Sequence, residues 1–134
     1  MFSRLSLMDV LVLNMKQALI VDDAPTAVEI LKRSLHGLDI QAHGVNSGED
    51  ALLYLAKADQ LPDYVFMDVM MPGIDGYETT EQLLGKEKTS HLPVIIYTTL
   101  RREEDKVKAT SVGAVGFLSK PFAQPALKAC LQSL

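Results

Sequence analysis

The residues of this chain best suited to chemistry are carboxylates, a hydroxyl and an amine that follow or end short apolar runs. They are Asp22, Asp23, Asp68, Thr98 and Lys120. Carboxylates that gather at one place repel one another, and at neutral pH they stay ionised only if positive charge joins them. The first prediction therefore concerns which cation accompanies these acidic groups.

The three carboxylates are balanced for a hard divalent cation. Their negative charges are neutralised by one Mg²⁺ together with the Lys120 ammonium. Mg²⁺ prefers an octahedral shell of oxygens and retains water, so one or two carboxylates and a backbone carbonyl suffice to hold it. The sequence predicts a magnesium site that needs no histidine or cysteine.

A carboxylate beside Mg²⁺, with a lysine and a hydroxyl nearby, can also accept a phosphoryl group. Asp68 is the candidate nucleophile, and its attack on phosphorus would give an aspartyl phosphate. The added negative charge should draw the Lys120 ammonium and the Thr98 hydroxyl inward. Phosphorylation would thereby be converted into movement.

The elements that must position these residues alternate along the chain. The apolar runs span 17–21, 40–45, 63–67, 93–98 and 115–119, and helical patterns start near Pro25, Ser47, Gly76, Arg102 and Gln124. Such alternation predicts an α/β fold, doubly wound, with a parallel sheet and helices on both faces. In these sheets the functional crevice lies beyond the carboxyl ends of the strands, where the candidate residues fall.

Composition limits the class of protein. A chain of 134 residues with 48% hydrophobic and 22% charged residues suits one globular domain. A net charge of −4 disfavours direct nucleic-acid binding, which needs a basic face. Cys130 is the only cysteine, which excludes an internal disulfide and fits a reducing compartment. We expect a cytoplasmic protein.

Residues 1–15 are expected to lie outside the core fold. Asp9 interrupts their apolar pattern, so a signal peptide is not supported, and no run reaches the roughly 18 apolar residues of a membrane span. The stretch is interpreted as a leader, with Met8 and Met15 as alternative starts. The other interpretation is an arm that packs against a neighbouring molecule.

Four segments resemble the receiver domain of bacterial two-component response regulators, especially the small chemotaxis type. They are "LIVDD" (19–23), "FMDVMMPGIDG" (66–76), "IIYTT" (95–99) and "GAVGFLSKPF" (113–122), in the family's order and at its separations. The resemblance covers nearly all of 16–134, which we expect to be the receiver domain. It implies a flavodoxin-like, five-stranded sheet with strand order 2-1-3-4-5.

The resemblance also implies roles in phosphorylation. Asp68 would be the phosphoacceptor and a metal ligand. Asp23 would bind Mg²⁺ directly, Asp22 would act mainly through water, and Met70 would offer only its backbone carbonyl. Thr98 and Lys120 would bind the phosphoryl group, with a cis peptide between Lys120 and Pro121.

Phe117 corresponds to the family's switching aromatic residue. Movement of Thr98 toward the phosphate should open a space for the ring, and ring rotation would alter the surface formed by 102–113, 115–119 and 124–134. This surface is the expected output. Phe117 lacks the hydroxyl of the tyrosine often found there, so the switch is expected to be purely steric.

The expected function is a signalling switch rather than an ordinary enzyme. A histidine kinase or a histidine phosphotransfer protein would supply the phosphoryl group, and a downstream protein or output domain would respond, without contact to nucleic acid or membrane. The alternatives are a Mg²⁺-dependent phosphohydrolase, which would commonly carry an aspartate at the position of Met70, and an interaction module that is never phosphorylated. Whether phosphorylation causes dimerisation stays open.

Three further side chains depart from the commonest family pattern. Thr99 stands where alanine or glycine is frequent, and Met70 and Leu100 are apolar where polar side chains could orient a water molecule. Hydrolysis of an aspartyl phosphate needs a water in line with phosphorus. We therefore expect slow self-dephosphorylation.

Overall fold

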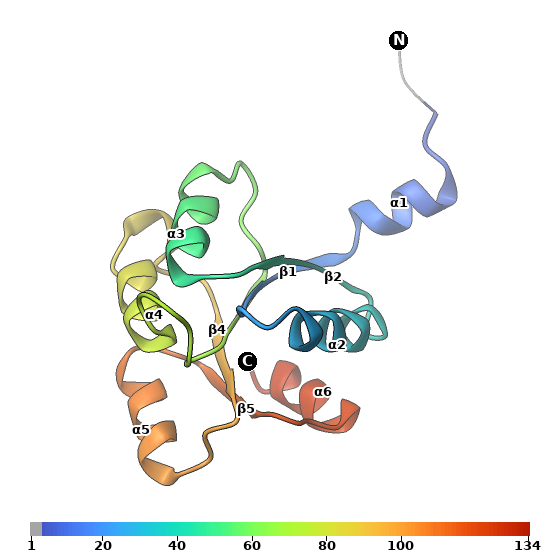
Figure 1. Ribbon diagram of the computed structural model, residues 1–134. Coiled ribbons are helices and arrows are strands. Elements are labelled where there is room, and N and C mark those ends of the chain that lie inside the picture. The colour runs from blue at the N-terminus through green and yellow to red at the C-terminus, as the bar shows by residue number, and fades with distance from the viewer. Residues whose placement is uncertain (1–3) are drawn as a thin grey trace.

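A computed structural model describes residues 4–134 as a twisted sheet between two layers of helices (Figure 1). The elements are α1 (Leu7–Leu13), β1 (Lys16–Val21), α2 (Pro25–His36), β2 (Ile40–Val45), α3 (Gly48–Lys57), β3 (Tyr64–Met67), α4 (Gly76–Leu84), the 3₁₀ helix η1 (Glu87–Thr89), β4 (Val94–Thr98), α5 (Glu103–Ser111), β5 (Gly116–Ser119) and α6 (Gln124–Gln132). All five predicted strands are present. Within residues 4–134, no helix combines the length and apolar character required to cross a bilayer.

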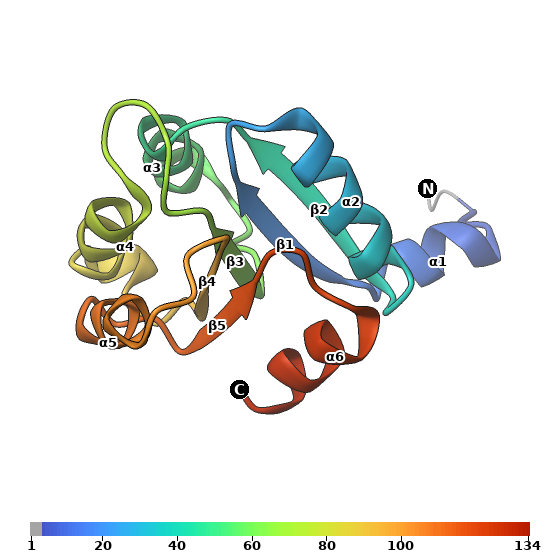
Figure 2. The same ribbon diagram turned by 60° about the horizontal axis from the view of Figure 1, so that its bottom comes forward.

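The strands pair in the order β2-β1-β3-β4-β5, and every pair is parallel (Figure 2). This confirms the predicted flavodoxin-like sheet. The register sets Val21 of β1 beside Met67 of β3, and Thr98 of β4 beside Ser119 of β5. Because all strands run the same way, their carboxyl ends lie at one edge of the sheet, where the predicted site residues follow.

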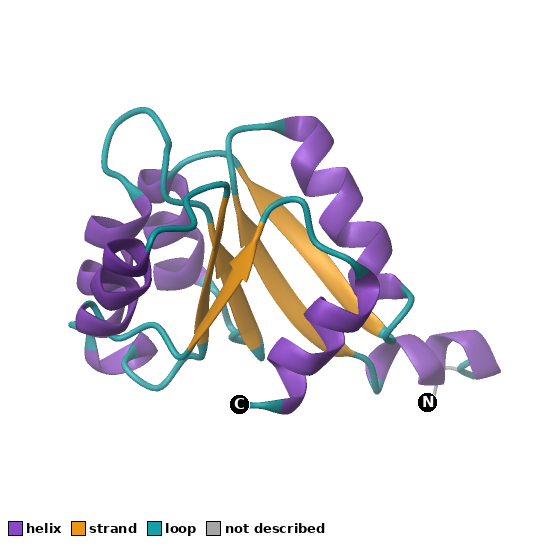
Figure 3. Ribbon diagram, turned by 90° about the horizontal axis from the view of Figure 1, so that it is seen from below, coloured by secondary structure: helices purple, strands orange, loops and turns teal. Residues whose placement is uncertain are grey.

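Helices α2 and α6 cover one face of the sheet, and α3, α4 and α5 cover the other (Figure 3). Successive strand residues point to opposite faces. In β1, Leu19 and Val21 accordingly join the core beneath α3, α4 and α5, whereas Ala18 and Ile20 join the core beneath α2 and α6. Burial on both faces explains why the inner strands β3 and β4 are apolar runs without alternating polar residues.

Side-chain caps fix where the helices α3 and α4 begin. Ser47 accepts a hydrogen bond from the Asp50 amide at 3.0 Å and begins α3, where the sequence predicted a helix start. Asp75 accepts a hydrogen bond from the Glu78 amide at 2.8 Å and begins α4. Each cap satisfies an amide that has no partner inside its own helix.

The short helix α1 was not predicted. It begins with a capping box, in which Ser6 and Asp9 exchange side-chain to backbone hydrogen bonds of 3.0 Å. None of its residues is buried, and it projects from the start of β1 (Figure 1). Of the predicted extension 1–15, residues 1–3 lie outside the described part of the chain. The remainder contributes nothing to either core.

Candidate phosphorylation site

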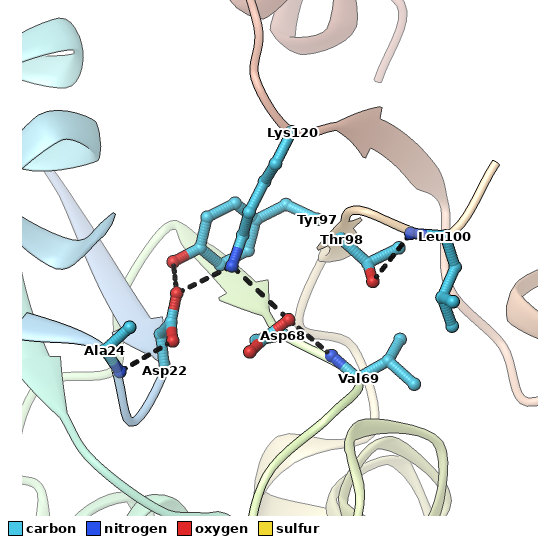
Figure 4. Close-up of polar contacts among 8 residues, drawn as sticks. All are labelled: Asp22, Ala24, Asp68, Val69, Tyr97, Thr98, Leu100 and Lys120. Atoms are coloured by element: carbon cyan, nitrogen blue, oxygen red, sulfur yellow. Dashed lines mark hydrogen bonds and ion pairs between the residues drawn. The ribbon is translucent and has the colours of Figure 1, made fainter. Parts of the chain in front are cut away.

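Four strands deliver the predicted residues to one place. Asp22 and Asp23 follow β1, Asp68 follows β3, Thr98 ends β4, and Lys120 follows β5. One carboxylate oxygen from each aspartate lies within 4.8 Å of the others. Figure 4 shows Asp22, Asp68, Thr98 and Lys120 around a common centre. The structure thus brings together the acidic groups that the sequence pattern placed at strand ends.

Lys120 forms the positive side of this site. Its Nζ lies 2.8 Å from Asp22 Oδ2 and 3.4 Å from Asp68 Oδ1 (Figure 4). The Lys120–Pro121 peptide is cis, as the family resemblance implied. The ammonium therefore bridges two carboxylates that would otherwise face each other across the site.

Asp22 is buried, and both of its carboxylate oxygens have partners. Oδ1 accepts a hydrogen bond from the Ala24 amide at 2.9 Å, and Oδ2 accepts from Lys120 and from the Tyr97 hydroxyl. Burial tends to raise the pKa of Asp22, but the hydrogen bonds from Lys120, Tyr97 and Ala24 together hold that pKa below its usual value. Asp22 is thus a fixed anion, while the neighbouring Asp23 is exposed.

Asp68 occupies a less favourable environment for a charge. Its residue is 7% exposed, and its Oδ1 accepts a hydrogen bond from the Val69 amide at 2.9 Å. Burial raises the pKa of Asp68 to about 6. The positive charge of Lys120 lowers this pKa, and the negative charge of Asp22 raises it. A further cation at the site would stabilise the anionic form that nucleophilic attack requires.

Of the two predicted switch residues, Thr98 borders this centre, whereas Phe117 is placed by its packing in a core. Thr98 is buried, and its hydroxyl oxygen accepts a hydrogen bond from the Leu100 amide at 3.3 Å. Phe117 is partly buried on β5 and packs against the core beneath α3, α4 and α5. The Thr98 hydroxyl is thus engaged with the chain that follows β4.

Backbone geometry behind Asp68 depends on Gly76. A Cβ at this position would lie 2.0 Å from the Asp68 carbonyl oxygen, a distance that no side chain tolerates. The Gly76 amide donates to the Val69 carbonyl at 2.9 Å. Within the same loop, Gly73 has a φ of 81°, a left-handed conformation that favours glycine. The Glu49 carboxylate of α3 accepts a hydrogen bond from the Ile74 amide of this loop at 3.2 Å. The loop is therefore closely fitted against the end of β3.

Sequence reasoning missed Tyr97. This residue is 1% exposed in β4, and its hydroxyl donates to Asp22 while its ring faces Lys120 (Figure 4). The available signal was a tyrosine among aliphatic residues next to Thr98, because a buried phenol hydroxyl requires a hydrogen-bond partner.

The donor set fits a magnesium ion. The clustered side chains offer carboxylate oxygens, which a hard cation prefers, and one ammonium against three acids leaves the site short of positive charge. Met70 is 65% exposed, and its apolar side chain offers no oxygen to a hard cation. Only its backbone carbonyl is suited to a role in holding such a cation.

This fold and site define a class of protein, and comparison with known families identifies it. Residues 18–132 match the family described as "Response regulator receiver domain". The chain therefore belongs to the receiver-domain family of two-component systems, as its sequence resemblance indicated.

Individual relatives agree with this assignment. The chain is 40% identical over 113 residues to protein PilH of Pseudomonas aeruginosa, which covers 84% of this chain and 92% of PilH. Other curated relatives are longer, and the chain spans as little as 25% of their length. It shares a TM-score of 0.81 and 28% identity with the chemotaxis response regulator CheY4 of Vibrio cholerae, over 90% of this chain and all of that one.

A second solved structure bears on the metal. The receiver domain of the Pseudomonas aeruginosa sensor histidine kinase PA1611 has a TM-score of 0.79 and 26% identity, covering 88% of this chain and 95% of that one. In that protein a magnesium ion is coordinated in the active site cleft.

Proposed function

We propose that this chain is a phosphorylation-dependent switch that accepts a phosphoryl group on Asp68 in the presence of Mg²⁺. The observation that supports this most directly is the cluster of Asp22, Asp23 and Asp68 oxygens within 4.8 Å, bridged on one side by Lys120. Membership of the receiver-domain family supports a role as a phosphoacceptor. The donor would be a histidine kinase or a histidine phosphotransfer protein.

The three aspartates and Met70 would have different roles in binding Mg²⁺. Asp23 and Asp68 would bind Mg²⁺ directly, together with the Met70 carbonyl, and Asp22 would act mainly through water. The occupied oxygens of Asp22 support this division, because Ala24, Tyr97 and Lys120 already engage them. When bound, the ion neutralises charge on the attacking and transferring oxygens.

Asp68 would then supply the nucleophile. One of its carboxylate oxygens forms a bond to phosphorus while the bond from phosphorus to the donor's leaving group breaks, and the metaphosphate-like group passes between them. Lys120 is already 3.4 Å from Asp68 Oδ1, so a small displacement of its ammonium would reach a phosphoryl oxygen. Thr98 would donate its hydroxyl to another.

The output would follow from the movement of Thr98 and Phe117. Release of the Thr98 hydroxyl from its position near Leu100 would free space beside β4, and the Phe117 ring would turn inward. This would change the surface formed by α5, β5 and α6, which we propose as the contact for a downstream protein or output domain. The location of Phe117 on β5, packed against the core beneath α3, α4 and α5, supports this route.

The direct test is intact-mass measurement after incubation with Mg²⁺ and a small phosphodonor. We expect one phosphoryl group per chain in the wild type and none in Asp68→Asn. Unmodified wild-type protein would contradict the proposal. Continuous release of phosphate from a monoester would instead favour the hydrolase, although Met70 offers no acid or base at the position where such enzymes commonly carry one.

We further propose that 16–134 form the receiver domain and that 1–15 lie outside it, since no α1 residue is buried. A cytoplasmic location is proposed from family membership. Comparing the molecular mass in solution of the phosphorylated and unphosphorylated protein tests whether phosphorylation causes dimerisation.

A further inference from the structure

Tyr97 links the hydrophobic core to the phosphorylation site. Its ring belongs to the core beneath α2 and α6, where it packs edge-on against Phe66 at a centroid distance of 6.3 Å. Its hydroxyl donates to Oδ2 of Asp22, which follows β1 (Figure 4). Packing of the ring on a rigid strand therefore fixes where this hydroxyl lies.

The same side chain also contacts Lys120. The Lys120 Nζ lies 4.1 Å from the centre of the Tyr97 ring, a distance at which a cation is attracted to an aromatic face. Tyr97 thus touches both members of the Lys120 and Asp22 ion pair. The hydroxyl and the ammonium bind the same oxygen, Oδ2 of Asp22.

We propose that Tyr97 is a positioning residue that allows Lys120 to leave Asp22 for the phosphoryl group. With Tyr97 present, Oδ2 of the buried Asp22 keeps a donor after the ammonium moves away. Without the hydroxyl, that oxygen would lose both of its side-chain donors, and a buried acceptor left without a partner is strongly disfavoured. This inference rests on the proposed function, since it concerns the movement of Lys120 toward phosphorus.

The neutrality of the Tyr97 hydroxyl suits it to this task. A tyrosine hydroxyl is uncharged at neutral pH, so the phenol is a neutral donor. A neutral donor satisfies Oδ2 without adding positive charge that would compete with a metal. A second lysine at the same place would instead neutralise the carboxylate.

The test measures binding of beryllofluoride, a stand-in for the phosphoryl group, in saturating Mg²⁺. Tyr97→Phe removes the hydroxyl and keeps the ring beside Lys120. Tyr77→Phe is the matched control, because Tyr77 is also a buried tyrosine, but its hydroxyl faces the Asp105 carbonyl at 3.4 Å, away from the site. We expect Tyr97→Phe to raise the apparent dissociation constant three- to tenfold and Tyr77→Phe to change it less than twofold.

The outcomes separate this inference from the proposed function. If wild-type protein binds beryllofluoride and Tyr97→Phe binds it equally well, the positioning role is wrong while the phosphoacceptor function stands. Equal weakening by the two variants would also refute it, since any lost hydroxyl would then suffice. If the wild type itself does not bind beryllofluoride, both proposals fail.

If Tyr97→Phe does not fold, the inference can still be tested on the wild-type protein. With ¹³C-labelled tyrosine, addition of Mg²⁺ and beryllofluoride should shift the Tyr97 ring resonances, because the ammonium leaves its position over the ring. Tyr54 and Tyr64, which lie on α3 and at the start of β3, serve as internal references. An unchanged Tyr97 signal in protein that has bound beryllofluoride would refute the inference.

Discussion

Replacing Asp68 by asparagine should stabilise the metal-free protein at neutral pH. Asp68 has a pKa of about 6 in the folded chain, above the usual 3.8, chiefly because it is buried. Between these two values the folded state binds a proton that the unfolded chain has released, so wild-type stability falls as pH rises through this interval. One pKa unit corresponds to about 1.4 kcal/mol, which limits the loss to roughly 3 kcal/mol.

The asparagine variant retains the shape of the side chain and an oxygen for the Val69 amide, but it carries no charge. We expect Asp68→Asn to exceed the wild type by about 1–3 kcal/mol in free energy of unfolding at pH 7, and to match it near pH 4. Urea denaturation in the presence of a chelator measures both values. Added Mg²⁺ should stabilise the wild type by mass action and the variant much less.

Asp59→Asn provides the control, because Asp59 is an exposed carboxylate on the loop after α3. It should change stability by less than about 0.5 kcal/mol at either pH. A wild type as stable as Asp68→Asn at pH 7 without metal would refute the argument. So would a difference between the two proteins that persists unchanged at pH 4.

Three further predictions follow from the loop, the site and the extension. Gly76→Ala should destabilise the protein by about 3 kcal/mol or more, because its methyl group would lie 2.0 Å from the Asp68 carbonyl oxygen. Gly85→Ala is the control and should destabilise the protein far less, because the nearest atom to its methyl group would be 3.1 Å away. Thermal unfolding of the two variants measures the difference. Met70→Asn should accelerate loss of the phosphoryl group from Asp68, followed by mass spectrometry, and an unchanged rate would contradict the expected hindrance of water. Deletion of residues 1–13 should leave the free energy of unfolding within about 0.5 kcal/mol, because α1 buries no residue, and a larger loss would place α1 inside the fold.

The sheet was predictable because the central strands are apolar runs, even though the edge strand β2 carries Gln41 and His43. Runs of this kind need cover on both faces, which only helical crossovers on both sides supply. Helix α1 was missed because Leu7–Leu13 has apolar residues around most of its circumference and gives no amphipathic period. Its only readable signal was the pair of Ser6 and Asp9, spaced as a capping box.

The candidate site was predictable in its acids and its lysine, because topology alone brings strand ends together. Two properties were not. Strand alternation assigns Tyr97 to a core, but it does not show that a phenol is long enough to reach Asp22. Charge counting balanced the site with Mg²⁺ present, but it did not show that in the metal-free protein burial raises the pKa of Asp68 despite the nearby Lys120.

The pairing of β4 with β5 has a consequence for how the site responds. The Lys120 amide donates to the Thr98 carbonyl at 2.8 Å, and Thr98 stands opposite Ser119 in the sheet. Thr98 and Lys120, which are expected to bind the phosphate oxygens, are therefore joined by a backbone hydrogen bond. Any backbone shift at one of them is transmitted to the other, so capture of the anion should be concerted rather than stepwise.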